Sequence, residues 1–228
     1  MAPFQHFLVL AVLAASLLTL VGILRTGRFR ECWTYVGYII ALIAFGAPIA
    51  FWPDRFWNLS WYLVKQAVYD SLRIGVALEL GFRVTASFPG AAARLRTLML
   101  LVLAVGGSTI ALASGQRSYS QLYDWQPAIT HAAIWILGVT AFVVLVYRLP
   151  ISNWHRILVI ALTGRFLLWS TLLKALALFG WSARAWVSYA DGLGDLLVAW
   201  TLAYYAWRPD ESAVVVRDLT ARIRKAFA

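Results

Sequence analysis

Long apolar stretches recur along this chain from its beginning to residue 207. They cover residues 4–24, 32–52, 60–82, 97–114, 127–147, 157–180 and 185–207. An α-helix rises about 1.5 Å per residue, so each stretch is about long enough to cross a hydrocarbon layer of roughly 30 Å. The sequence therefore predicts an all-α fold, a polytopic membrane bundle of seven transmembrane helices.

The basic residues of the connections predict the orientation of this bundle. One side carries only Arg55, Arg117 and Arg184. The other side carries many more: Arg25, Arg28, Arg30, Arg83, Arg94, Arg96, Arg148, Arg156, Arg208, Arg217, Arg222, Arg224 and Lys225. Short cytoplasmic loops hold the excess of arginine and lysine, so we expect the N-terminus outside and the C-terminus in the cytoplasm. The net charge of +10 is then a topology signal, and no nucleic-acid partner is expected.

Composition supports one membrane domain over residues 1–207, with 62% hydrophobic and 13% charged residues. The opening residues lack the basic region of a cleaved signal peptide, so the first stretch is expected to remain as a helix. Cys32 is the single cysteine, which excludes a disulfide within the chain and a cysteine metal cluster. We expect the protein in a bacterial inner (cytoplasmic) membrane.

Residues 208–228 form a tail with an amphipathic pattern. Val215, Leu219, Ile223 and Phe227 recur at helical spacing. The basic residues Arg217, Arg222, Arg224 and Lys225 are distributed around them. This pattern predicts a short cytoplasmic helix lying on the anionic inner leaflet, and the alternative is a docking helix for a cytoplasmic partner.

Charged residues inside the third, sixth and seventh stretches are the main candidates for function, because ionisable groups are unfavourable within a bilayer. Lys65, Lys174, Glu79 and Arg83 lie near the ends of their stretches, where their side chains are expected to reach the interface. The remaining candidates are Asp70, Arg73, Arg165, Asp191 and Asp195.

Depth and helical spacing predict that these candidates meet. Counted from the outer end, Asp70 and Asp195 lie at roughly 15 Å, Arg73 and Arg165 at roughly 20 Å, and Asp191 at roughly 9 Å. Gln66, Tyr69, Asp70 and Arg73 share one face of the third stretch, and Asp191 and Asp195 share one face of the seventh.

Two interpretations of this polar cluster stay open. With two positive and three negative charges, one acid would lack a full partner and could hold a proton or a cation. The cluster is either an ionic staple that selects helix partners or a polar cavity, open to the outside, for a ligand, an ion or a proton.

Two short motifs resemble the signatures of presenilin-type intramembrane aspartyl proteases. Tyr69 and Asp70 read YD, and residues 192–195 read GLGD. The resemblance implies that Asp70 and Asp195 form a catalytic dyad that shares one proton. In that family the aspartates lie on consecutive helices, whereas here three stretches separate them, and Arg73 and Arg165 favour two ionised carboxylates.

Length and topology also resemble microbial rhodopsins, but the seventh stretch has no lysine for a retinal Schiff base. His131 is a candidate haem or chlorophyll ligand, with a packing role as the alternative; no metal site is predicted, and the sequence does not identify a cofactor. The segments FRECWTYVGY, ALELGFRV and WTLAYYAWRPDE resemble uncharacterised bacterial seven-helix membrane proteins, which implies the same topology and no activity.

The sequence thus predicts a noncatalytic membrane protein, because it contains no output domain, catalytic set or sizeable loop. The expected function is that of a subunit or receptor-like module of a larger bacterial membrane assembly, with the lipid bilayer and other membrane subunits as partners. The alternatives are an ion, proton or small-solute pathway through the polar cluster, and the protease.

Overall fold

Helices make up all the regular structure in the described part of the chain, which in this computed structural model comprises residues 3–56, 58–85, 97, 120–146 and 151–209. The all-α prediction is confirmed for these residues. The long helices are α1 (Pro3–Thr26), α2 (Trp33–Phe51), α4 (Leu59–Thr85), α6 (Ser120–Val146), α7 (Asn153–Phe179) and α8 (Arg184–Trp207). Short elements are η1 (Arg28–Glu31), α3 (Pro53–Phe56) and η2 (Gly180–Ala183).

Three of the described helices are long and apolar enough to cross a membrane: Phe4–Thr26, Trp33–Phe51 and Asn153–Phe179. Helices α4 and α8 have sufficient length, but their charged side chains lower their hydropathy. Residues 98–114, most of the predicted fourth stretch, lie outside the described residues, as does the predicted amphipathic tail from residue 210 onward.

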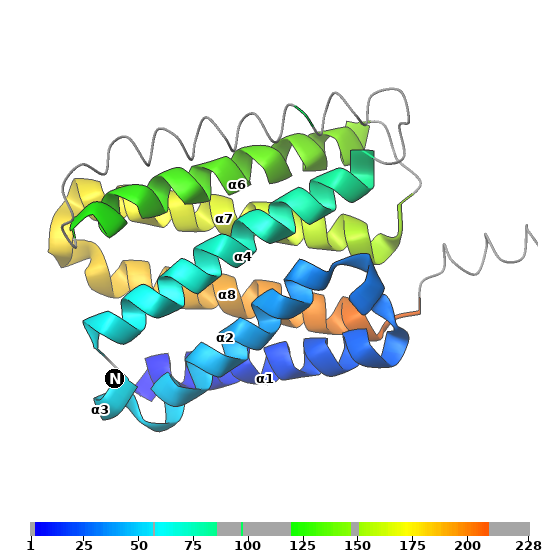
Figure 1. The fold of residues 1–228 in the computed structure, drawn as a ribbon. Helices are drawn as coiled ribbons and strands as arrows, with labels where there is room; N and C mark the ends of the chain where they lie inside the picture. The colour runs from blue at the N-terminus through cyan, green and yellow to red at the C-terminus, as the bar shows by residue number, and fades with distance from the viewer. Residues whose placement is uncertain (1–2, 57, 86–96, 98–119, 147–150, 210–228) are drawn as a thin grey trace, which may run out of the picture.

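The long helices pack side by side in a ring (Figure 1). Neighbours in the ring are α1 and α2, α2 and α4, α4 and α6, α6 and α7, and α7 and α8. The ring closes where α8 packs against α1, although these helices lie at opposite ends of the described chain. Gly22 permits this approach, since a Cβ atom there would lie only 2.9 Å from the Cβ of Ala206. Trp207 adds a hydrogen bond from Nε1 to the Leu18 carbonyl oxygen at 3.0 Å.

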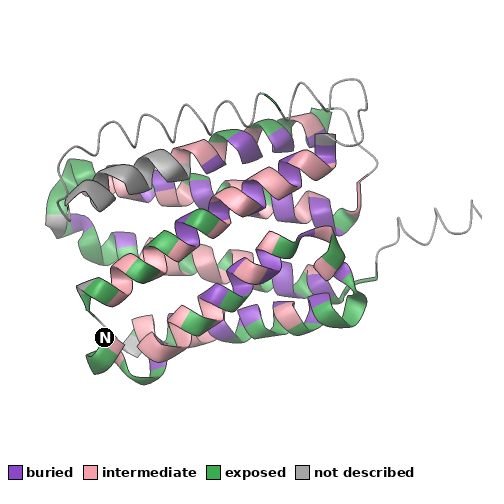
Figure 2. Ribbon diagram, viewed as in Figure 1, coloured by how far each residue is buried: buried purple, intermediate pink, exposed green. Residues whose placement is uncertain are grey.

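Most of the apolar core lies in one half of the bundle, which we call the packed half. It contains the end of α1, the start of α2, the end of α4, the start of α7 and the end of α8. Each ring helix contributes a fully buried side chain to this core: Ile23, Ile39, Leu80, Leu137, Leu158 and Leu202. Figure 2 shows the change along α4, from exposed and half-buried turns near its start to largely buried turns near its end.

The opposite half, which we call the polar half, is less tightly packed. No residue from Asp191 to Thr201 on α8 is fully buried. A smaller apolar cluster of Leu172, Ala183 and Val187 joins α7 to α8 near this end. The ring is therefore held together mainly at its packed half.

A buried arginine also stabilises the packed half. Gly27 adopts a left-handed conformation (φ 72°) that turns the chain into η1, where Arg28 is buried. The Arg28 guanidinium donates hydrogen bonds to the carbonyl oxygens of Tyr205 and Arg208 and lies 5.5 Å from the ring centroid of Trp154. A cation at the C-terminus of α8 is favourable because the helix dipole is negative there.

Glu79 corrects one expectation from the sequence. Its carboxylate does not simply extend toward an interface, because it accepts hydrogen bonds from the N-terminus of α2. The donors are the backbone N–H of Trp33 at 3.0 Å and both the backbone N–H and hydroxyl of Thr34, at 2.8 and 2.6 Å. Arg83, one turn further along α4, donates to the same carboxylate at 2.7 Å. Glu79 thus caps a neighbouring helix, which the sequence pattern did not reveal.

Candidate polar site

The first part of the polar cluster lies on α4. Arg73 Nη1 donates to Asp70 Oδ1 at 2.8 Å, and the Gln66 side-chain amide donates to the same oxygen at 3.0 Å. Both charged residues are buried, with 6% of Asp70 and 7% of Arg73 exposed. Spacings of three and four residues place such side chains on one helix face, so this pairing follows from helical geometry.

The second part joins α7 to α8. Arg165 Nε donates to Asp195 Oδ1 at 2.5 Å, and Arg165 Nη2 donates to Asp191 Oδ1 at 2.7 Å. The arginine side chain is buried, whereas 26% of the Asp191 side chain and 42% of the Asp195 side chain are exposed. One guanidinium therefore bridges two carboxylates that are separated by one turn of α8.

The two parts lie close enough to influence each other. Arg73 lies within electrostatic reach of Arg165, of Asp191 and of the Tyr38 hydroxyl on α2. Its guanidinium also lies 5.6 Å from the ring centroid of Phe166, one residue after Arg165. The predicted approach of the charged faces is thus seen in the Arg165 contacts between α7 and α8 and in the contact of Arg73 on α4 with Phe166 on α7.

Tyr69 borders the cluster rather than belonging to its ion pairs. Its ring is buried and packs at 5.9 Å from Tyr38 and 6.0 Å from Phe45, both on α2. It also lies within electrostatic reach of Arg73 and Asp195. Tyr69 therefore forms an aromatic wall between α2 and the charged groups.

Lys65 lies beside the cluster, between two aromatic rings of α4. Its ammonium group lies 5.3 Å from the ring centroid of Tyr62 and 5.9 Å from that of Tyr69. Asp191, Asp195 and Arg73 are within its electrostatic reach. With Lys65 included, the cluster has equal numbers of cationic and anionic groups. We call this set the polar network: Lys65, Gln66, Asp70, Arg73, Arg165, Asp191 and Asp195.

Several buried donors at the polar network have no hydrogen-bond partner among the described residues. They are Arg73 Nε, Arg165 Nη1, Trp169 Nε1 and, nearer the start of α4, Trp61 Nε1. All of these groups donate and none accepts. An unsatisfied buried donor is unfavourable by about 1–3 kcal/mol, so the network is chemically matched to acceptor atoms from water or from a ligand.

Asp70 and Asp195, the aspartates of the two protease-like motifs, accept hydrogen bonds from different side chains. Asp70 accepts hydrogen bonds from Arg73 and Gln66, while Asp195 accepts from Arg165. Each aspartate thus has its own arginine, which favours two ionised carboxylates over a pair that shares one proton.

His131 takes part in a contact between two helices. His131 Nε2 lies 2.8 Å from the Ser170 hydroxyl, a hydrogen bond that links α6 to α7. Among the described residues, no group of three His, Cys, Asp or Glu side chains could hold a metal ion. The basic tail residues Arg217, Arg222, Arg224 and Lys225 lie outside the described residues.

Comparison with known proteins gives no further assignment. No protein-family model, curated protein or solved structure matches this chain.

Proposed function

We propose that the chain is a seven-span protein of a bacterial inner membrane, with its N-terminus outside and its C-terminus in the cytoplasm. The arginine-rich connections support this orientation, because Arg25, Arg28, Arg30, Arg83, Arg156 and Arg208 lie at helix ends of the packed half. In this orientation the packed half faces the cytoplasm and the polar half faces outward.

Within that membrane we propose a noncatalytic receptor-like module, acting as a subunit of a larger assembly. The observation that carries the proposal is the difference in packing between the two halves of the bundle. The polar network lies among half-buried helices, whereas the packed half is closed by apolar side chains from all ring helices. A small polar ligand or ion could reach the network from outside, and its binding would shift the helices that present a surface to partners inside.

Partner binding is tested by gentle extraction into nanodiscs from the native host, followed by size determination and mass spectrometry. The expected result is a set of stoichiometric membrane companions. Asp195→Asn, which alters the polar network, should change the affinity for these companions, whereas Asp54→Asn on the exposed α3 should leave it unchanged. A monomer without companions would contradict the subunit role.

An ion or proton pathway is the second candidate, favoured by the 42% exposure of the Asp195 side chain within an otherwise buried charge network. It requires a route through the packed half that the buried core obstructs. Flux into liposomes that Asp195→Asn abolishes and Asp54→Asn preserves would favour the pathway over the receptor. We do not propose the protease, because each aspartate already pairs with an arginine.

A further inference from the structure

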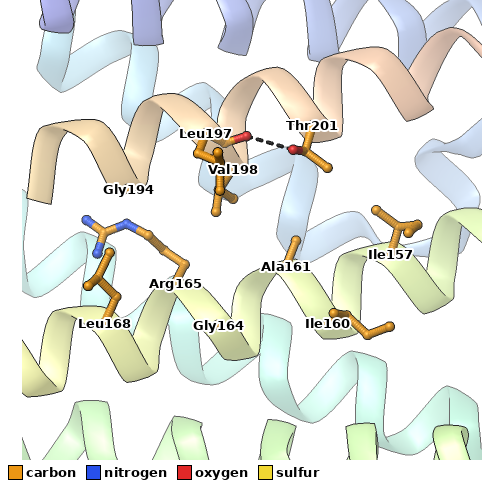
Figure 3. A pocket seen from close by; sticks show the side chains of 10 residues that line it. All are labelled: Ile157, Ile160, Ala161, Gly164, Arg165, Leu168, Gly194, Leu197, Val198 and Thr201. Atoms are coloured by element: carbon orange, nitrogen blue, oxygen red, sulfur yellow. Dashed lines mark hydrogen bonds between the residues drawn. The ribbon is translucent and has the colours of Figure 1, made fainter. Parts of the chain in front are cut away.

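A groove between α7 and α8 lies on the outside of the ring, next to the polar network (Figure 3). It encloses about 350 Å³, within the range of small-molecule sites. Exposed side chains at its edge, such as Leu197 (72% exposed) and Ile160 (40% exposed), indicate that it opens away from the bundle. Its lining includes Ile157, Ala161, Leu168, Val198 and Leu197.

The groove is almost wholly apolar, and the hydroxyl group of Thr201 in its lining already makes a hydrogen bond. Thr201 donates to the Leu197 carbonyl oxygen at 2.8 Å, one turn back on α8. Two glycines shape the groove. Gly194 admits the side chain of Leu168, whose Cδ2 would clash with a Cβ atom there, and Gly164 leaves open space, because a Cβ atom would meet nothing within 4 Å.

Arg165 lies at one end of the groove, with its guanidinium beside Leu168 and Gly194 (Figure 3). Its side chain is 9% exposed. Two of its donor atoms bind Asp195 and Asp191, while Nη1 is buried and has no acceptor among the described residues. One turn along α7 and outside the groove lining, Trp169 Nε1 is also buried without an acceptor among the described residues, and its ring lies 5.9 Å from the Arg165 guanidinium.

The unsatisfied Nη1 of Arg165 limits the chemistry of a ligand in the groove. The ligand must present an acceptor, since only donors are unsatisfied. Arg165 already pairs with two carboxylates, so a neutral acceptor fits better than a third anion. The body of the ligand must be apolar, because the groove is lined by aliphatic side chains.

The depth of Arg165 in the bilayer then limits which lipids can bring a carbonyl to it. Counted along the helix, Arg165 lies at roughly 20 Å from the outer end of its span, near the middle of the bilayer. Ester carbonyls of glycerolipids stay with their headgroups near the interface. A carbonyl that reaches Arg165 must belong to a molecule without a charged or zwitterionic headgroup.

From this combination we infer that the α7–α8 groove binds an isoprenoid quinone. One quinone carbonyl accepts a hydrogen bond from Arg165 Nη1, the ring lies beside Leu168 and Gly194, and the chain follows the apolar groove toward Ile157. This inference goes beyond the proposed receptor function and shares with it only the placement of Arg165.

The inference is tested with tritiated decylubiquinone and the full chain in nanodiscs, with empty nanodiscs as the background. A single saturable site is expected. Gly164→Leu extends a side chain into the groove without touching the charged groups, and should weaken binding by about tenfold or more. Gly138→Leu is the matched control, because a Cβ atom there on α6 also meets nothing within 4 Å and should leave affinity unchanged.

Competition experiments test whether the groove recognises the carbonyl of the quinone. Decylbenzene, which has a similar chain and no carbonyl, should fail to displace the quinone, and dioleoylglycerol should also fail. Absence of saturable binding, equal binding by Gly164→Leu, displacement by decylbenzene or displacement by dioleoylglycerol would each overturn the quinone site. None of these outcomes bears on companions captured through the packed half, so this test fails or succeeds separately from the receptor proposal.

Discussion

The two halves of this bundle use different interactions to hold the same helices. In the packed half, α1, α2, α4, α6, α7 and α8 meet through buried aliphatic side chains, and Arg28 and Glu79 satisfy helix ends. In the polar half, Arg165 joins α7 to α8 through ion pairs with Asp191 and Asp195, while Arg73 pairs with Asp70 within α4. The comparison suggests that the packed half supplies stability, while the polar half supplies groups that a ligand or ion can address.

The largest expected effect tests whether the polar half is also essential to stability. Arg165→Met leaves Asp191 and Asp195 without their shared cation, and loss of one partner of a buried pair destabilises by about 3–5 kcal/mol. Unfolding in detergent micelles measures this loss. The triple variant Arg165→Met, Asp191→Asn, Asp195→Asn should regain most of the stability, since no uncompensated charge remains. A triple variant as unstable as the single variant would show that the ion pairs themselves hold the helices.

A core substitution should have the next largest effect. Leu80 is fully buried in the packed half, and Leu80→Ala should lower the free energy of unfolding by about 2–5 kcal/mol through lost contacts and a cavity. Leu197→Ala at an exposed position of the polar half is the control, expected within about 0.5 kcal/mol of the parent. Equal effects at the two positions would remove the distinction between the halves.

The cap that Glu79 forms on α2 should contribute less to the free energy of unfolding. Glu79→Gln keeps the size of the side chain but loses the charge that accepts from the backbone of α2 and from Arg83, so we expect a loss of about 0.5–2 kcal/mol. The first turn of α2 should then exchange its amide hydrogens faster, as measured by hydrogen exchange with mass spectrometry. Unchanged exchange in residues 33–36 would contradict the capping role.

The smallest effect concerns the charge balance of the polar network. Lys65→Met should change stability by less than about 1 kcal/mol, because Lys65 makes no short ion pair with the aspartates that it faces. It removes one cation, so an aspartate is expected to take up a proton, seen as a protonated-carboxyl band in the infrared spectrum. Lys174→Met is the control, and the same band in both variants would place Lys65 outside the network.

The sequence predicted which side chains of α4 and of α8 lie together in the polar network. Helical spacing placed Gln66, Asp70 and Arg73 on one face, and these residues are linked by hydrogen bonds. It also placed Asp191 and Asp195 together on α8, where Arg165 joins them. The sequence did not reveal the cap made by Glu79, since this contact depends on how α4 is rotated against its neighbours. The donors at Trp33 and Thr34 are mainly backbone N–H groups, which every helix start offers, so their pairing with Glu79 cannot be recognised in the sequence.

The sequence alone determined that the described chain is helical, which residues share a helix face, and where the apolar stretches lie, because these properties depend on periods of a few residues and on local composition. Only the tertiary structure decided that α8 closes the ring against α1, that Arg165 pairs with both aspartates of α8 while Arg73 pairs with Asp70, and that a groove opens between α7 and α8. These features depend on the rotation and approach of helices far apart in the chain, which are set by the packing of all their side chains together.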